Sequence, residues 1–128
     1  MRQFYRGRVG FVPTMGALHE GHAELLRRSQ RENDLSILSI FVNPHQFNSP
    51  EDFANYPKSL DADLKVAAEC RVDWVFTPEA QDLFPSDSNF HISESSRSLV
   101  MEGLHRPGHF RGMLGVVLRL LNLAQASH

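Results

Sequence analysis

Two histidines three residues apart, His19 and His22, are the side chains of this sequence that are best placed to do chemistry. A short apolar strand leads through Pro13 into a glycine turn just before them, and a helix is predicted to begin at Glu20. Residues three apart share one face of a helix, here beside the unpaired N–H groups and positive dipole of its first turn. This combination favours a site for anionic oxygens, above all phosphate.

The spacing resembles the His-x-Gly-His signature of the nucleotidyltransferase superfamily. Gly21 fits such a site because a residue without a β-carbon lets a nucleotide base lie close over the helix start. Two alternatives stay open: a pair of surface histidines, or two zinc ligands completed by His105 or His109. Helical zinc ligands usually lie four residues apart, which favours phosphate over zinc.

Strands alternate with helices along the chain, which predicts parallel βαβ units and an α/β fold. Strands are predicted over 8–14, 34–42 and 73–77, helices over 20–31, 59–70, 79–84, 96–101 and 111–124, and an extended piece over 90–93. In helix 59–70 the predicted buried face carries Leu60, Leu64, Ala67 and Ala68. Residues 43–57 hold three prolines and predict one long loop, of a length that is usually functional.

The composition is that of one ordinary globular domain, with 41% hydrophobic and 22% charged residues among 128. A net charge of −2 and scattered basic residues argue against a nucleic-acid partner, and no apolar run predicts a membrane span. The single cysteine, Cys70, fits a reducing cytoplasm, and we expect it to be a packing residue because nothing nearby in the sequence would lower its pKa.

A second group of polar residues follows the strand at 34–42, at the end where parallel sheets bind substrates. Asn43 and Gln46 offer amide groups suited to hydroxyls and carboxylates. The alternative is that Asn43 and Pro44 simply form a turn. Tyr56-Pro57-Lys58 could deliver a phenol or an ammonium group to the site, or could be only a junction between loop and helix.

Residues 102–112 combine three glycines and a proline with several ionisable side chains, which suggests a shaped loop. Arg106 and Arg111 could clamp a carboxylate or a phosphate. The alternative, which stays open, is an ion pair with Glu102 that merely holds the loop.

Taken in order, the segments 13–22, 41–47, 56–57 and 102–112 resemble the pantothenate synthetase (pantoate–β-alanine ligase) family along essentially the whole chain. The resemblance implies a Rossmann-like parallel sheet of the His-x-Gly-His nucleotidyltransferase type. It also implies joining of (R)-pantoate to β-alanine through a pantoyl-adenylate, with ATP split to AMP and pyrophosphate and with Mg²⁺ present. No resident metal site is expected.

The resemblance also assigns roles to individual residues. His19 and His22 would be catalytic, stabilising charge on the phosphates, with His22 as the proton donor. Gln46 would hold pantoate and lie near β-alanine, with support from Asn43, while Glu102 and Arg106 would line the same cavity. ATP would be contacted by Met15, Gly16, Ala17, Leu18, His19, Glu20, Gly21 and His22, and Tyr56 would belong to a segment that flaps over the site.

The sequence departs from the family in two respects. Lys58 stands where the family usually has arginine, and the family's later motifs and C-terminal lid domain are absent. Residues 1–128 are therefore expected to form an incomplete N-terminal nucleotide- and pantoate-binding domain, cytoplasmic and homodimeric, with poor turnover alone. The rival hypotheses are another nucleotidyltransferase of this type, or a non-enzymatic small-molecule-binding or dimerisation module.

Overall fold

The computed structural model describes residues 5–84, 92, 105 and 109–128. Three parallel strands form one sheet in the order β1-β2-β3. These strands are β1 (Val9–Thr14), β2 (Leu35–Ile40) and β3 (Trp74–Phe76). The three predicted strands are confirmed, each shorter by one or two residues at an end, whereas the predictions for 90–93 and 96–101 lie outside the described residues apart from Ile92.

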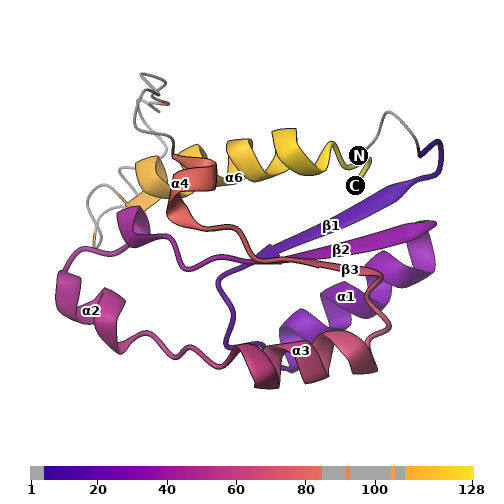
Figure 1. Cartoon of the computed structure of the whole chain (residues 1–128), viewed down its shortest axis with the longest axis horizontal. Helices are drawn as coiled ribbons and strands as arrows, with labels where there is room; N and C mark the ends of the chain where they lie inside the picture. The colour runs from indigo at the N-terminus through magenta and orange to yellow at the C-terminus, as the bar shows by residue number, and fades with distance from the viewer. Residues whose placement is uncertain (1–4, 85–91, 93–104, 106–108) are drawn as a thin grey trace.

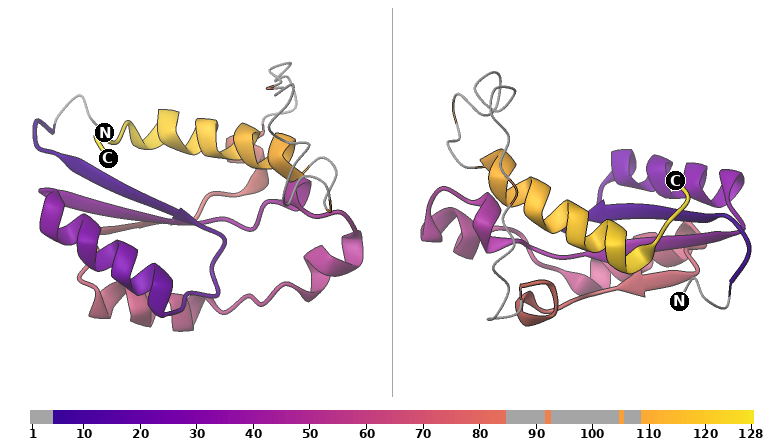
Figure 2. Two further views of the ribbon diagram at one scale, coloured as in Figure 1. Left: turned by 180° about the vertical axis from the view of Figure 1, so that it is seen from behind. Right: turned by 90° about the horizontal axis from the view of Figure 1, so that it is seen from above.

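Helices cover both faces of this sheet. Helices α1 (Glu20–Glu32) and α3 (Leu60–Glu69) lie on one face, and α6 (His109–Ala124) lies on the other with the short α4 (Ala80–Leu83) beside it (Figure 1). The view from above shows α6 running across the sheet on the side opposite α1 (Figure 2). The expected α/β fold with a parallel sheet is therefore confirmed.

The alternation of side chains along β1 divides the core into two clusters. Val9 and Phe11 point toward α6, whereas Val12 points toward α1 and α3. The α6 side is filled by Val9, Phe11, Ile37, Phe41, Leu83, Val116 and Leu120, and the other side by Val12, Ala23, Leu26, Leu38, Ala67 and Cys70. Each helix layer thus has its own apolar contact with the sheet.

The single cysteine is a core residue. Cys70 has an exposed fraction of 5% and packs against Ala23 and Ala67 between α1 and α3. Burial raises the pKa of its thiol, which keeps it protonated and unreactive. The prediction of a packing role is confirmed.

Within the described residues, no helix is long and apolar enough to cross a membrane.

The prediction of one uninterrupted loop over residues 43–57 is wrong. A 3₁₀ helix (Pro44–Gln46) and a short helix α2 (Pro50–Asn55) form there, and α2 lies beyond the carboxyl ends of the strands (Figures 1 and 2). The start signal was present in the sequence: the Ser49 hydroxyl accepts the Asp52 N–H at 3.1 Å, and Pro50 begins the helix.

The prediction for the face of α3 is right for Ala67 and wrong for Leu60, Leu64 and Ala68. Leu60 and Leu64 have exposed fractions of 48% and 40%, whereas Asp63 and Ala67 are buried. The helix is turned so that Asp63 meets backbone donors beyond β1, and this polar contact cannot be seen in an apolar periodicity. Burial of a charged group is favourable only where such partners exist.

The last residue of the chain pairs with the outer edge of β1. The Val9 carbonyl oxygen accepts the His128 N–H at 3.2 Å, and the His128 carbonyl oxygen accepts the Phe11 N–H at 2.9 Å. This is the hydrogen-bond pattern of a parallel bridge centred on Gly10. The segment after α6 thus returns to the sheet parallel to β1.

Candidate nucleotide-binding site

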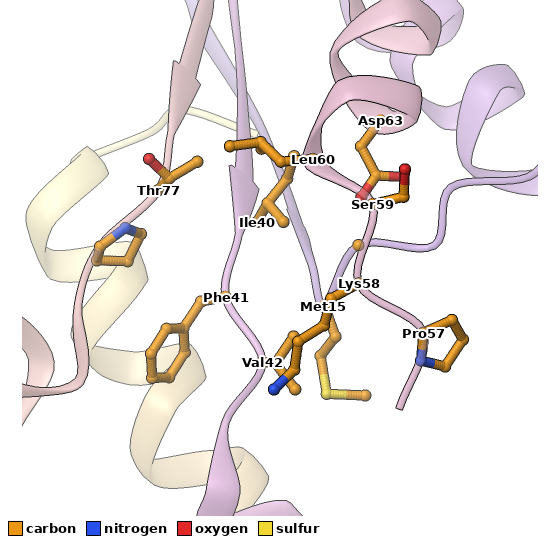
Figure 3. Close-up of a pocket in the computed structure, with 12 residues that line it drawn as sticks. Met15, Ile40, Phe41, Val42, Pro57, Lys58, Ser59, Leu60, Asp63 and Thr77 are labelled. Atoms are coloured by element: carbon orange, nitrogen blue, oxygen red, sulfur yellow. The ribbon is translucent and has the colours of Figure 1, made fainter. Parts of the chain in front are cut away.

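A pocket of about 220 Å³ opens at the carboxyl ends of the three strands; we call it the strand-end pocket (Figure 3). Met15 enters it from the end of β1, Phe41 from the end of β2 and Thr77 from the end of β3. Its complete wall is Met15, Gly16, Ile40, Phe41, Val42, Pro57, Lys58, Ser59, Leu60, Asp63, Thr77 and Pro78. Ligands of open α/β sheets bind at this edge.

The turn between β1 and α1 borders this pocket and has an unusual backbone. Gly16 has a φ of 77° and Ala17 a φ of 51°, both in the left-handed region, which strains a residue with a β-carbon. The Thr14 hydroxyl donates to the Ser39 carbonyl oxygen at 2.8 Å and accepts the Gly16 N–H at 3.2 Å. The turn is therefore fixed to β2 on one side.

Asp63 fixes the other side of the same turn, and the sequence analysis did not identify it. Its carboxylate accepts the Ala17 N–H at 3.1 Å and the Leu18 N–H at 2.8 Å. One signal was available: Asp63 lies four residues before Ala67 and seven before Cys70, so it occupies the same face of α3 as two buried residues. A carboxylate in a buried stripe needs a partner.

The two histidines lie together at the start of α1, with ring centroids 4.1 Å apart. His19 Nδ1 accepts the Gly21 N–H at 3.1 Å, and His22 Nδ1 accepts the His19 N–H at 3.3 Å. Because a backbone N–H can only donate, both neutral rings carry their proton on Nε2. The pair therefore caps the helix with one set of nitrogens and offers two N–H donors with the other.

Gly21 leaves room for the ring of His19. A β-carbon at position 21 would lie 2.9 Å from His19 Cε1 and 3.1 Å from His19 Nδ1. The glycine thus lets the imidazole fold back over the helix start, whereas the sequence had suggested that it makes room for a nucleotide base.

His22 is expected to titrate below the ordinary histidine pKa of 6.5. Burial lowers the pKa of His22, the neighbouring His19 lowers it further, and the negative charge of Asp63 opposes both effects. The unfolded chain then binds a proton that the folded chain resists, so the His22 contribution to stability is complete above pH 6.5 and declines as the pH falls through the folded-state pKa. NMR titration of the His22 ring measures this directly, and a midpoint at or above 6.5 would contradict it.

The amide of Asn43 is used inside the protein. Its side chain has an exposed fraction of 0%; Oδ1 accepts the His45 N–H at 3.1 Å and Nδ2 donates to the Gly112 carbonyl oxygen at 3.2 Å. Gln46 is also buried, and its carbonyl oxygen accepts the His109 Nδ1–H at 3.0 Å. Asn43 thus joins the 3₁₀ helix to the start of α6.

The segment around α2 is held together by aromatic side chains. The ring of Phe47 lies 5.5 Å from the rings of both Phe53 and Tyr56, and the Lys58 ammonium lies 4.4 Å from the centre of the Phe53 ring. Burial raises the pKa of Tyr56, and the charge of Asp63 raises it further. The Tyr56 phenol is therefore a neutral group near the turn.

The structure brings together some of the predicted site residues. Met15 and Gly16 line the strand-end pocket, whereas its wall contains neither histidine, nor Asn43 or Gln46. Glu102 and Arg106 lie outside the described residues. No group of three histidine, cysteine or carboxylate side chains that could hold a metal occurs in the described part of the chain.

A parallel sheet whose first strand leads into a helix starting with His-x-Gly-His defines a Rossmann-like domain of the nucleotidyltransferase type. The sequence profile of one family, described as Pantoate-beta-alanine ligase, matches residues 1–128. The chain belongs to this family.

Individual relatives agree with the family match. The chain is 48% identical over 124 residues to a pantothenate synthetase from Bdellovibrio bacteriovorus, covering 97% of this chain and 49% of the relative. It is 52% identical over 120 residues to the pantothenate synthetase of Deinococcus radiodurans, covering 94% and 43%. The chain thus spans about half the length of the curated relatives it matches.

Solved structures agree as well. The pantoate-beta-alanine ligase of Francisella tularensis, complexed with beta-gamma ATP and beta-alanine, matches with a TM-score of 0.90 and 45% identity, over 94% of this chain and 47% of that chain. A pantothenate synthetase from Thermus thermophilus matches with a TM-score of 0.89 and 42% identity, over 95% and 45%. The resemblance found in the motifs is therefore confirmed.

Proposed function

We propose that this chain is the ATP- and pantoate-binding part of a ligase that joins (R)-pantoate to β-alanine. The observation that carries the proposal is the family match over the whole chain, combined with the imidazole pair at the start of α1. The F. tularensis relative was crystallised with beta-gamma ATP and beta-alanine, which supports the same ligands here.

In the first step, a carboxylate oxygen of pantoate attacks the α-phosphorus of ATP. The bond from that phosphorus to the bridging oxygen breaks, and pyrophosphate leaves with the electron pair. Negative charge grows on the phosphate oxygens as this bond breaks, so fixed donors aimed at them lower the barrier. The Nε2–H groups of His19 and His22, together with the positive end of α1, are the donors that we assign to this task.

In the second step, the amine of β-alanine attacks the acyl carbon of pantoyl-adenylate. AMP leaves with the electron pair of the broken carbon–oxygen bond, and the new amide nitrogen loses a proton. The acyl-adenylate must be kept from water until this happens. The aromatic cluster of Phe47, Phe53 and Tyr56, on the segment that includes α2, is the part of the described chain that we assign to this shielding.

The remaining binding roles follow the family resemblance. We assign pantoate to Gln46, with β-alanine nearby, and we assign Asn43 to holding that segment in place through its bond to Gly112. Glu102 and Arg106 stay as proposed lining residues. Met15 to His22 are the proposed contacts of ATP.

We propose that Mg²⁺ reaches the site as part of the ATP substrate. Magnesium is commonly held by substrate phosphates and only one or two carboxylates. The buried carboxylate beside the turn, Asp63, already accepts two backbone N–H groups, which fits a metal carried mainly by ATP. A cytoplasmic location and a homodimer are further proposals; the exposed Trp74 and Phe76 on β3 supply apolar area that a second copy could cover.

Calorimetry of the 128-residue chain tests the proposed function. ATP with Mg²⁺ and pantoate are titrated separately, with CTP as the matched control nucleotide. We expect saturable binding of ATP or pantoate, weaker binding of CTP, and little or no formation of pantothenate when β-alanine is added. Absence of binding by both substrates would favour the non-enzymatic module, and tighter binding of CTP would favour another nucleotidyltransferase.

A further inference from the structure

A buried carboxylate occupies the centre of the turn that leads to the two histidines. Asp63 has an exposed fraction of 3%, and each of its oxygens accepts one backbone N–H, from Ala17 and from Leu18. Figure 3 shows this side chain on the first turns of α3, at the wall of the strand-end pocket. Among the contacts of the described residues, these two bonds link α3 directly to the β1–α1 turn.

The turn needs an acceptor at this place. Gly16 and Ala17 both have left-handed backbones, and successive N–H groups in such a turn converge on a space that attracts an anion. Asp63 fills this space so closely that a β-carbon at Gly16 would lie 2.7 Å from its Oδ2. Ala17 and Leu18 have no helical or strand hydrogen bonds of their own, so Asp63 supplies their acceptors.

Helix α3 is suited to carry this charge. Asp63 lies near the N-terminal end of α3, where the helix dipole favours a carboxylate. Asp61 also lies in the first helical turn of α3 but is exposed. It therefore has the same charge and the same position relative to the helix dipole as Asp63, without the contact to the β1–α1 turn. The two aspartates therefore form a matched pair for experiments.

We propose that Asp63 is a positioning residue: it fixes the β1–α1 turn so that His19 and His22 present their Nε2–H groups to the phosphates of the nucleotide. The proposal rests on the proposed function for its last step, the binding of ATP. Two sets of N–H donors then have different roles. The N–H groups of Ala17 and Leu18 are taken by Asp63, whereas the imidazoles keep their Nε2–H groups for a ligand.

The negative charge of Asp63 affects the pKa values of two side chains near the β1–α1 turn, His22 and Tyr56. It acts to raise the pKa of His22 and the pKa of Tyr56, in the first case against the effects of burial and of His19. Removal of the charge should therefore lower the pKa of His22 further. A residue that only filled space would leave that pKa unchanged.

The test compares Asp63→Asn with Asp61→Asn in the 128-residue chain. Asparagine keeps the size of Asp63 but loses the charge and one acceptor, because its NH₂ group would face a backbone donor. We expect hydrogen exchange at Ala17 and Leu18 to become at least tenfold faster, the pKa of His22 to fall, and the Kd for ATP to rise at least tenfold. Asp61→Asn should leave all three unchanged.

Two further results keep the test decisive. In the parental chain, the Ala17 and Leu18 amides should exchange as slowly as amides of β1, and this measurement needs no variant. Fast exchange there, or unchanged exchange and unchanged His22 pKa in Asp63→Asn, would overturn the proposal. If the parental chain bound no ATP, the proposed function would fail, while exchange and titration would still decide the role of Asp63 in the turn.

Discussion

Replacing His22 by alanine is expected to weaken ATP binding roughly ten- to a hundredfold. A hydrogen bond to a charged group contributes about 1.5–3 kcal/mol, and His22→Ala removes one such donor. The same change deprives the His19 N–H of its acceptor, so we also expect a loss of about 1 kcal/mol in stability. Calorimetry with ATP and chemical denaturation measure the two effects.

The control is His22→Gln, which separates capping from phosphate binding. A glutamine at the third position of a helix can accept the N–H of the capping residue, as in the usual capping box. We expect His22→Gln to regain most of the stability lost in His22→Ala but only part of the ATP affinity, because its NH₂ donor does not occupy the position of His22 Nε2. Parental affinity in both variants would refute the phosphate-binding role of His22.

Replacing Gly112 by alanine is expected to destabilise the protein by about 3 kcal/mol and to lower its Tm by about 10 °C. The new β-carbon would lie 2.2 Å from the carbonyl oxygen of His45, a backbone atom that cannot rotate away. The 3₁₀ helix would have to move away from α6, which breaks the bond from Asn43 Nδ2 to the Gly112 carbonyl oxygen. Thermal unfolding measures the loss.

Gly115 provides the matched control one turn further along α6. Among the residues that the structure describes, a β-carbon there would approach only the Arg119 side chain, at an ordinary contact distance of 3.5 Å. Because alanine is a better helix former than glycine, Gly115→Ala should stabilise the chain by about 0.5–1 kcal/mol. Equal Tm values for the two variants would contradict the close packing of α6 on the 3₁₀ helix.

The errors of the sequence analysis have a common cause. Helix α2 was missed because the prolines of residues 43–57 were interpreted as loop formers, although Pro50 follows a capping serine. The face of α3 was assigned from Leu60 and Leu64, which are exposed, whereas a charged residue, Asp63, is buried. In both places a polar contact decided the structure: a local one between Ser49 and the Asp52 N–H at α2, and a distant one between Asp63 and the β1–α1 turn at α3.

In the site, contacts between neighbouring residues could be predicted from the sequence, whereas contacts between distant residues could not. The spacing of His19, Gly21 and His22 was enough to predict a shared face at a helix start, because these residues contact one another within a single turn. Asn43 was interpreted as a ligand or a turn former. Its bond to Gly112, 69 residues away, depends on how α6 docks and could not be foreseen.

The sequence by itself determined the order of the three strands and of the helices α1, α3, α4 and α6, the parallel sheet and the histidine pair, since each depends on periodicity or spacing over a few residues. Only the tertiary structure decided that Asp63 closes the turn before those histidines and that Asn43 joins the 3₁₀ helix to α6. These contacts join segments far apart in the chain, so they exist only after the two helix layers have packed on the sheet.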